Sequence, residues 1–532
     1  MMQTLSDARR EALQEQRTKM VASRSLIARI DWGSMILILL ALAFGLWRLD
    51  VAPPLFWDEG WHMMVARTWV DEGHYGRLLG GLPNVSGLDA GFPLVVSVAL
   101  AFHLLGVGVW QGRLVVVLYT VGALLLVHHL ARRLFNRRTA AATLAVVLLM
   151  TPFVPQFHVL HVGRMVLGET PMLFFLLAGY ACLRLALEKS PWFLPLALVC
   201  WVIALDIKLQ VLPFWAVSLG TALLVALWRG QKRTAGMVVI GLVGSLATKQ
   251  MWSWLWALWL GSETVGGAPL GSLIGVTALV FVARVRLIAL RFAVVMGGVV
   301  VLGLVRELWK GIRERNEGPS GTDVVRWALL ALAGSWLGWY VLFSVSWIRY
   351  LMPVVFLGSM FAAALLHDWT DGFDISSTMK RAARLLGRRQ FDGQGLRALL
   401  AIVIITWTVT GATSSFVLSG FPEADTSVQQ AADFLNSQSD RDALVEGYLY
   451  ELFFLLDRPY HYPPDEVNVP VIEALTWQQQ VPIEYDPLSA DPDYLVVNWD
   501  FITWIVYDKV LQSGAFRSLR AFGPYEIYER VR

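Results

Sequence analysis

Charge is scarce in this chain of 532 residues, since Asp, Glu, Lys and Arg together make up only 16% of it. Hydrophobic residues make up 56%, and 24 residues are Trp. A soluble protein needs far more charge to cover its surface, so the composition excludes a soluble globular protein and indicates a polytopic membrane protein. The formal net charge of +3 is too small to indicate a nucleic-acid partner.

Cysteine is also scarce, and both cysteines, Cys182 and Cys200, lie inside apolar segments. We therefore expect buried packing thiols and no disulfide framework. The first 30 residues are charged and carry no signal-peptide cleavage pattern, so we expect the first apolar segment to be retained. Internal repeats and low-complexity tracts are lacking as well.

Long apolar segments are abundant, and a membrane-spanning helix needs roughly 20 such residues. We predict about eleven spans, with thirteen as the alternative. The predicted spans are 34–49, 113–131, 139–153, 166–187, 192–207, 210–228, 235–258, 288–305, 327–345, 350–367 and 398–418. Two further apolar runs, 92–105 and 269–283, are predicted to lie at the outer surface, because counting either as a span would place a later basic block outside.

The basic residues predict the orientation of the chain. They gather in five blocks, which mark cytoplasmic faces. The blocks are 9–29, 132–138, 229–233, 306–315 and 380–389. We therefore predict a cytoplasmic basic N-terminus over 1–33 and a transmembrane domain over 34–418 with an outer loop at 50–111. The mixed polar and apolar segment 419–532 is predicted to form a small extracytoplasmic α/β domain.

Within that last segment, short patterns predict individual elements. We expect helices at 432–435 and 451–456, and strands at 443–448, 494–498 and 525–530. Four aromatic residues are predicted to belong to its core rather than to a ligand-binding surface: Tyr448, Tyr450, Phe453 and Phe454. Because it follows a span that is predicted to end outside, the domain is expected to lie over the outer ends of the helices, in a covering or positioning role rather than a catalytic one.

Two adjacent carboxylates, Asp58 and Glu59, follow the first predicted span. Paired acids at a membrane surface repel each other and gain nothing from burial unless a cation or a proton donor meets them. Asp58 is therefore the first candidate for a general base, with Glu59 beside it. The alternative is that Asp58 caps the helix that begins here, which would not require the second acid.

Histidines nearby are weaker candidates. His62 lies one turn after Asp58 and could face the same site, although a structural hydrogen bond is the more common role. His158, His161 and Arg164 have a spacing that could place them on one helical face. Metal binding by the two histidines is the sharper interpretation, and an interfacial polar turn is the alternative.

Further ionisable residues lie near predicted span ends on the same side as Asp58. Glu169 is at the mouth of a span, where an ionisable group indicates a functional site by default, unless it pairs with Arg164. Lys208 and Arg349, the latter followed by Tyr350, could together hold an anion such as a phosphate. The alternative for both cations is that they extend to the lipid headgroups.

Four segments carry a resemblance to a known family. They are Asp58-Glu59 with Ala66-Arg67, Gly112-Arg113-Leu114 through Ala131 to Phe135, Gly163-Arg164 with Glu169-Thr170-Pro171, and Arg349-Tyr350-Leu351-Met352-Pro353. In order and spacing the chain resembles the GT-C superfamily of integral membrane glycosyltransferases. It is most similar to the branch of the protein O-mannosyltransferases and the aminoarabinose transferase of lipid A, over roughly residues 30–370.

The resemblance implies the GT-C fold and an enzyme that uses a polyprenyl-phosphate-linked sugar as donor. Asp58 would be the base, with Glu59 and Glu169 assisting or binding an acceptor or a metal. Lys208 and Arg349 would hold the phosphate. Further substrate-binding residues would be Tyr350, Arg164 and His62.

The implied reaction is an inverting transfer to a hydroxyl or amine of a protein or glycolipid acceptor at the outer face of the membrane. A dependence on a divalent metal stays open, and no nucleic acid is expected. Two other classes of function stay open too: an inactive scaffold subunit of a membrane complex, and a ligase or flippase of lipid-linked substrates. A transporter would need polar residues at the bilayer midplane and internal repeats, which the sequence lacks.

Overall fold

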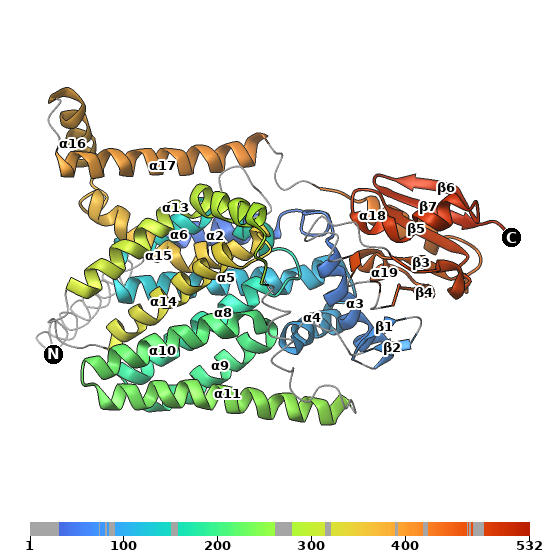
Figure 1. Cartoon of the computed structure of the whole chain (residues 1–532), viewed down its shortest axis with the longest axis horizontal. Helices are drawn as coiled ribbons and strands as arrows, with labels where there is room; N and C mark the ends of the chain where they lie inside the picture. Colours follow the sequence, from blue (N-terminus) through green and yellow to red (C-terminus); the bar gives the residue numbers. More distant parts are fainter. Residues whose placement is uncertain are drawn as a thin grey trace, which may run out of the picture.

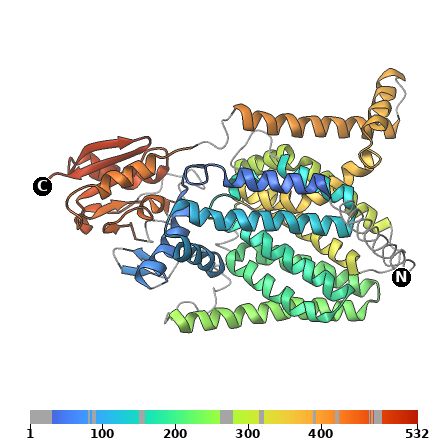
Figure 2. The same cartoon turned by 180° about the vertical axis from the view of Figure 1, so that it is seen from behind.

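The computed structural model describes residues 31–73, 75–79, 82–84, 91–149, 158–260, 279–313, 321–388, 392–418, 424–464, 467, 470–471 and 483–532. Long helices form a bundle, and a small sheet domain at the C-terminus lies at one end of it (Figure 1). We call this the domain end of the bundle. The view from behind shows the same two parts, with α5 running along the bundle toward the domain (Figure 2).

Each of the eleven predicted spans overlaps one helix of the bundle. These helices are α2 (Trp32–Leu46), α5 (Val109–Leu134), α6 (Arg137–Leu149), α8 (Glu169–Glu188), α9 (Leu194–Ile207), α10 (Leu212–Trp228), α11 (Lys232–Leu260), α13 (Ala283–Arg313), α14 (Gly321–Leu342), α15 (Met352–Trp369) and α17 (Gly393–Leu418). Among the described residues, 7 helical segments are long and apolar enough to cross a membrane. The fold is thus that of a multi-pass membrane protein, while the number of spans and their orientation stay predictions.

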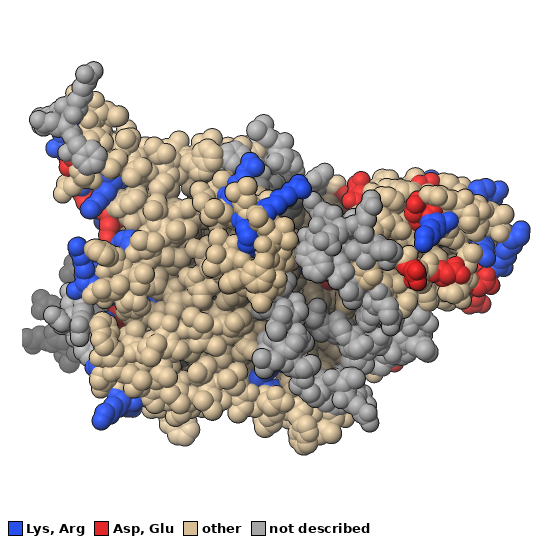
Figure 3. Space-filling model, viewed as in Figure 1, with Lys and Arg blue, Asp and Glu red and all other residues tan. Residues whose placement is uncertain are grey.

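The surface agrees with a membrane environment. On the face shown in Figure 3, the middle of the bundle has few charged side chains, whereas charged side chains gather at its far end and on the C-terminal domain, and a group of Lys or Arg side chains lies toward its domain end. Large apolar side chains such as Leu224, Ile240 and Val294 are more than half exposed on these helices. A lipid phase explains this exposure, because water would disfavour so large an apolar surface.

The segment predicted as an outer loop, 50–111, is largely structured. It contains α3 (Trp57–Glu72), a short antiparallel hairpin of β1 (Arg77–Leu79) and β2 (Leu82–Asn84), and α4 (Phe92–Leu105). These elements lie at the domain end of the bundle (Figure 1). Most of the other run predicted to lie at the outer surface, 269–283, lies outside the described residues.

The C-terminal domain holds a mixed sheet of five strands in the order β4-β3-β5-β7-β6. The strands are β3 (Val445–Gly447), β4 (Tyr460–His461), β5 (Tyr494–Asn498), β6 (Phe516–Phe522) and β7 (Tyr525–Arg530). The helices are α18 (Ser427–Asn436), α19 (Tyr450–Phe453) and α21 (Asp508–Gln512). β3 is parallel to β4 and β5, whereas β7 is antiparallel to β5 and β6.

All five elements predicted here occur, and the four aromatic residues assigned to the core are buried, as predicted. The domain packs on α3 through aromatic rings: the Tyr450 ring lies 5.0 Å from Trp57 and 4.8 Å from Trp61, between centroids. Such clusters stabilise an interface beyond the area that they bury. The domain therefore rests on the helix that carries the paired carboxylates.

Candidate active site

Helix α3 positions Asp58 and Glu59 in its first turn. The N-cap is Phe56, and the Glu59 side chain accepts a hydrogen bond from its backbone N–H at 3.4 Å. Both acids lie where the helix dipole favours negative charge. Asp58 is therefore not the N-cap, which removes the structural alternative considered for it. The helix ends at Gly73, whose φ of 78° is the left-handed conformation that glycine adopts readily.

Asp58 pairs with Arg349, which comes from η5 (Ile348–Leu351) at the start of α15. The Arg349 Nη1 to Asp58 Oδ2 distance is 2.5 Å, and the Asp58 side chain remains 26% exposed. The guanidinium also lies over the rings of Phe56 and Trp347, at 5.7 and 5.2 Å from their centroids. Its Nε has no hydrogen-bond partner among the described residues. Arg349 thus keeps one buried donor unsatisfied beside an accessible carboxylate.

A second ion pair joins Glu169 and Lys208, with the Lys208 Nζ at 2.5 Å from Glu169 Oε1. Glu169 begins α8, and Lys208 lies between α9 and η3 (Leu209–Val211). The ammonium also lies 5.6 Å from the centre of the Tyr350 ring. Oε2 of Glu169 is buried and has no partner among the described residues. The local pairing with Arg164 considered for Glu169 is not what the structure contains.

His62 lies between the two ion pairs. Its Nδ1 is 2.5 Å from the carbonyl oxygen of Val166. Burial lowers the pKa of His62 and Lys208 acts in the same direction, while Asp58 and Glu169 oppose them. The ring is therefore neutral at pH 7, with Nδ1–H donating to Val166 and Nε2 left as an acceptor.

The structure thus brings together six of the eight residues predicted for the site. They are Asp58, His62, Glu169, Lys208, Arg349 and Tyr350. Two of the six are cations and two are carboxylates, so the cluster is balanced in charge. An anion that enters it can take over the partners of either carboxylate.

Glu59 and Arg164 face away from this cluster. Glu59 is fully buried and forms a two-pronged ion pair with Arg113 of α5, at 2.7 and 2.8 Å. Its Oε1 also accepts a bond from the Val166 N–H at 3.0 Å. Arg164 is buried and donates to the carbonyl of Trp47. Both residues tie loops of the domain end together.

Arg113 belongs to the motif that begins Gly112-Arg113-Leu114, but the sequence alone did not indicate its role. It donates to the carbonyls of Leu49 at 3.1 Å and Pro54 at 3.5 Å as well as to Glu59. One side chain therefore joins α5, the chain after α2 and the first turn of α3. An arginine inside a predicted span was the signal that could have singled it out.

The C-terminal domain contributes Glu451 near Asp58. A side chain at Gly60 would collide with the backbone of Tyr450 and Glu451, so glycine allows this close approach. Burial raises the pKa of Glu451 to about 7, with the Asp58 charge acting in the same direction. Its Oε1 accepts a bond from Tyr525 at 3.2 Å. This acidic residue was not predicted as part of the site.

No group of three or more His, Cys, Asp or Glu side chains among the described residues could hold a metal ion. His158, considered as a ligand, uses both ring nitrogens in structural bonds: Nε2 lies 2.9 Å from the Leu148 carbonyl, and Nδ1 accepts from the Leu160 N–H at 3.0 Å. The described residues thus offer no metal centre on which a mechanism could be built.

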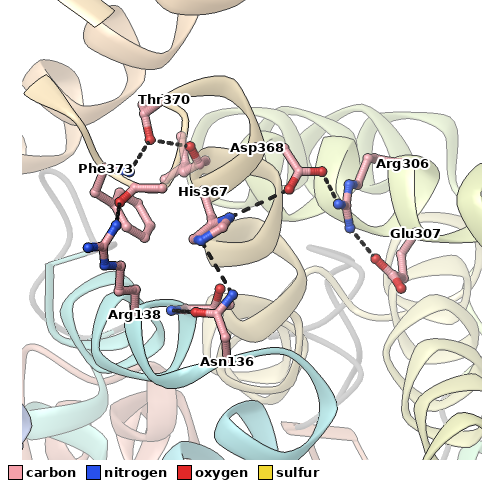
Figure 4. Close-up of polar contacts among 11 residues, drawn as sticks. Asn136, Arg138, Arg306, Glu307, His367, Asp368, Thr370 and Phe373 are labelled. Carbon is pink, nitrogen blue, oxygen red and sulfur yellow. Dashed lines mark hydrogen bonds and ion pairs between the residues drawn. The ribbon is translucent and has the colours of Figure 1, made fainter. Parts of the chain in front are cut away.

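Figure 4 shows a second polar cluster, which joins α6, α13 and the end of α15 that lies away from η5. Arg306 binds Glu307 and Asp368, and His367 Nε2 lies 3.3 Å from the Asn136 amide. Its ion pairs link neighbouring helices, which is a structural role. It lies about 25 Å along α15 from Arg349, by the rise of a helix.

No protein-family model matches the chain, and no curated protein matches it. Solved structures do resemble it. One is ArnT from Cupriavidus metallidurans bound to undecaprenyl phosphate, with a TM-score of 0.62 and 15% sequence identity over 93% of this chain and 98% of that one. Another is the oligosaccharyltransferase AglB from Archaeoglobus fulgidus in complex with an inhibitory peptide and a dolichol-phosphate. Its TM-score is 0.54, with 13% identity over 94% of this chain and 74% of that one.

The chain therefore shares the fold of ArnT and AglB, which agrees with the GT-C fold predicted from the sequence motifs. The similarity to ArnT covers nearly the full length of both chains, so it includes the C-terminal sheet domain as well as the helix bundle. At such low identity the similarity concerns the fold, and the chemistry has to be argued from the site.

Proposed function

We propose that this protein is a membrane glycosyltransferase that moves a sugar from a polyprenyl-phosphate donor to a hydroxyl or amine of an acceptor. The observation that carries the proposal is the pair of ion pairs at the domain end, Asp58 with Arg349 and Glu169 with Lys208. Two cations beside an accessible carboxylate are what a phosphate leaving group and a nucleophile in need of a base require. The lipid phosphates bound to ArnT and AglB support the same donor class.

In the proposed reaction, the donor phosphate binds Arg349 and Lys208. The Nε–H of Arg349 has no partner among the described residues, and three aromatic rings beside the guanidinium favour a cation, so a phosphate that reaches it can bind while the side chain keeps its place. As the phosphate takes over the cation, Asp58 loses its ion-pair partner. A carboxylate released from an ion pair is a better base. Donor binding would thus prepare Asp58 for the acceptor.

Transfer then makes one bond to the anomeric carbon and breaks another. The acceptor O–H or N–H gives its proton to Asp58, and the acceptor atom forms a bond to the anomeric carbon. The bond from that carbon to the phosphate oxygen breaks, and the polyprenyl phosphate leaves with its charge held by Arg349 and Lys208. Attack from the side opposite the phosphate inverts the anomeric configuration. Phosphate is a good leaving group, so no separate acid is needed.

Glu59 and Arg164 receive a different role in this proposal from the one that the resemblance implied. Glu59 has no accessible oxygen, because both of its oxygens bind Arg113 and backbone N–H groups. We therefore assign Glu59 to positioning the first turn of α3, and Arg164 to holding the chain at Trp47. Glu169 would position Lys208, and His62 would hold the Val166 loop against α3.

The test is transfer by purified protein in nanodiscs, supplied with radiolabelled polyprenyl-phosphate sugars and membrane extract as acceptor. Asp58→Asn should lower transfer by about a hundredfold or more, because it removes the base while keeping the side chain's size. The matched control is Asp323→Asn. The Asp323 carboxylate is also bound by an arginine, Arg326, at 2.7 Å, but it lies in the first turn of α14 and not in the ion-pair cluster. Full activity of Asp58→Asn would overturn the assignment of the base.

A further inference from the structure

A cavity of about 810 Å³ lies between the second half of α3 and the C-terminal domain. From α3 it is lined by Met64, Arg67, Thr68, Asp71 and Glu72. From the domain, its walls include residues of the 456–461 segment and of η6 (Pro487–Ala490). A cavity of this size can hold a small organic ligand.

This cavity is separate from the site around Asp58. Residues of an α-helix are 100° apart, so Met64, Arg67 and Asp71 project from the side of α3 roughly opposite Asp58. Asp71 is also about 20 Å further along the helix, at 1.5 Å per residue. Neither Asp58 nor Arg349 lines the cavity. A ligand here would bind without touching the groups proposed for transfer.

A carboxylate–histidine pair reaches the cavity from the sheet. Glu446 on β3 and His461 on β4 are register partners in neighbouring parallel strands. The Glu446 side chain is fully buried and binds Nδ1 of His461. Its Oε1 also accepts bonds from the Tyr485 hydroxyl at 2.9 Å and the Tyr507 hydroxyl at 3.0 Å.

Nε2 of His461 has no hydrogen-bond partner among the described residues, and the pairing with Glu446 favours the tautomer with its proton on Nδ1. The His461 side chain is 18% exposed and lines the cavity. Burying the Glu446 carboxylate costs free energy, and a single hydrogen bond to a histidine does not require it. With three donors around it, the carboxylate instead fixes the orientation of the His461 ring. His461 therefore offers the cavity a fixed hydrogen-bond acceptor.

A second fixed group is Arg458, which is only 7% exposed and lines the same cavity. Its Nη atoms donate to the carbonyls of Asp440 at 3.2 Å and Gln438 at 3.3 Å. Its Nε is buried and has no partner among the described residues. An unsatisfied buried donor costs free energy unless a ligand or water meets it.

The charges of the lining favour a neutral, hydroxyl-rich ligand. Arg67 is already bound by Asp71 at 3.1 Å and by Asp457 at 2.6 Å, so it is not open to a phosphate. Glu72 adds a further negative charge to the wall. An anion would meet these carboxylates, and an acyl chain would meet too many ionised groups. Sugar hydroxyls can donate to carboxylates and to His461 and can accept from Arg458.

We propose that this cavity binds a neutral carbohydrate unit, recognised by His461 and Arg458, in the part of an acceptor that is remote from the reacting atom. Its place in an acceptor rests on the proposed function, whereas the binding of a carbohydrate does not. Binding energy from a remote unit holds the acceptor in place while Asp58 acts on the opposite side of α3.

The test is binding of the full chain in nanodiscs to an array of neutral oligosaccharides of glucose, galactose, mannose and N-acetylglucosamine. Matched oligosaccharides that carry uronic acid or phosphate complete the array. Wild type should bind at least one neutral oligosaccharide. His461→Phe should weaken that binding about tenfold, the loss expected for one hydrogen bond. Ala490→Trp, which fills the cavity and leaves the Glu446–His461 pair intact, should weaken it at least as much.

Two controls separate this inference from the proposed function. His103→Phe changes an exposed histidine on α4, and Asp58→Asn changes the proposed base, and both should bind the oligosaccharide as wild type does. Binding unchanged in Ala490→Trp, binding only of the acidic oligosaccharides, or no binding to the array would each overturn the carbohydrate site. None of these results depends on whether the protein transfers a sugar.

Discussion

Breaking the buried ion pair of Glu59 and Arg113 by removing one partner should destabilise the protein more than the loss of any other single contact near the site. Both side chains are 0% exposed, and two N–O distances of 2.7 and 2.8 Å join them. Arg113→Met keeps much of the side chain's volume but removes the charge and all of its hydrogen bonds. Glu59 then remains buried without a counter-ion.

The expected loss follows from that burial. Removing one partner of a buried ion pair typically costs about 3–5 kcal/mol, because the other charge is left uncompensated in a low dielectric. Arg113→Met should lie at the upper end of this range, since the carbonyl of Leu49 also loses its donor, at 3.1 Å. The double variant Glu59→Gln/Arg113→Met should recover about 1–3 kcal/mol of that loss, because no lone charge is left.

The measurement is the free energy of unfolding of the protein in mixed micelles, obtained from reversible SDS titration. A matched control is Arg517→Met, which breaks another arginine–glutamate pair, with Glu529 at 3.0 Å, whose side chains are 73% and 41% exposed. An exposed pair contributes about 1 kcal/mol or less, so this variant should unfold nearly as wild type does.

Two results would refute the reasoning. The first is a double variant whose loss equals the sum of the single losses, since the two groups would then not be coupled. The second is a Glu59→Gln variant whose free energy of unfolding equals that of wild type but which has lost the proposed transferase activity. That result would return Glu59 to the chemical role implied by the family resemblance.

Two further predictions concern the site and the domain beside it. Lys208→Gln should weaken binding of polyprenyl phosphate about tenfold or more in a nanodisc binding assay, because one of two cations is lost, whereas Lys249→Gln should not. The control is closely matched, since Lys208 is 2.5 Å from Glu169 and 23% exposed, and Lys249 is 2.5 Å from Asp206 and 22% exposed; equal losses would contradict a phosphate role. Because burial raises the pKa of Glu451 to about 7, folding favours its protonated form, so the contribution of Glu451 to stability should fall as the pH rises from about 4.5 to 7 and then level off. Glu451→Gln should remove up to roughly 3 kcal/mol of this pH-dependent loss in melting experiments, and an unchanged pH profile would contradict the raised pKa.

The convergence of charges at the domain end could be predicted from the sequence because it follows from topology. Basic blocks predict which ends of the spans share a side, and ionisable groups at those ends are few. Asp58 and Arg349 were therefore placed on one side although 291 residues separate them, and the structure joins them in an ion pair. The positions of the helices could be predicted as well, because apolar segments of about 20 residues have few alternative structures in a membrane.

The partners within the site could not be predicted. Sequence proximity suggested Arg164 as the partner of Glu169, but Gly168 and the α8 N-terminus pack directly on Lys208, which takes that place. Likewise the neighbours Asp58 and Glu59 looked like one functional pair. Their side chains are 100° apart on α3, so Asp58 meets Arg349 while Glu59 enters the bundle toward Arg113. Two adjacent acids on one helix therefore have different partners and different roles.

The C-terminal domain illustrates a different limit. The predicted strands were those with runs of apolar or aromatic residues, such as Tyr494–Asn498. Phe516–Phe522 was missed because its middle residues are exposed and include two arginines, as expected of an edge strand. The pairing of Glu446 with His461 depends on strand order, since β4 lies beside β3 only in the folded sheet. No local pattern indicates such a contact.

Helix α3 connects these observations, because each of its faces meets a different part of the molecule. Asp58 faces the ion-pair cluster, Glu59 is anchored in the bundle, Trp57 packs on the C-terminal domain, and Arg67 lines the cavity. A helix of 16 residues moves largely as a rigid rod, so a shift at one face displaces the others. Docking of the domain on Trp57 therefore also sets the position of Asp58 relative to Arg349. This coupling explains how a domain without proposed catalytic groups can govern the geometry of the site proposed for transfer.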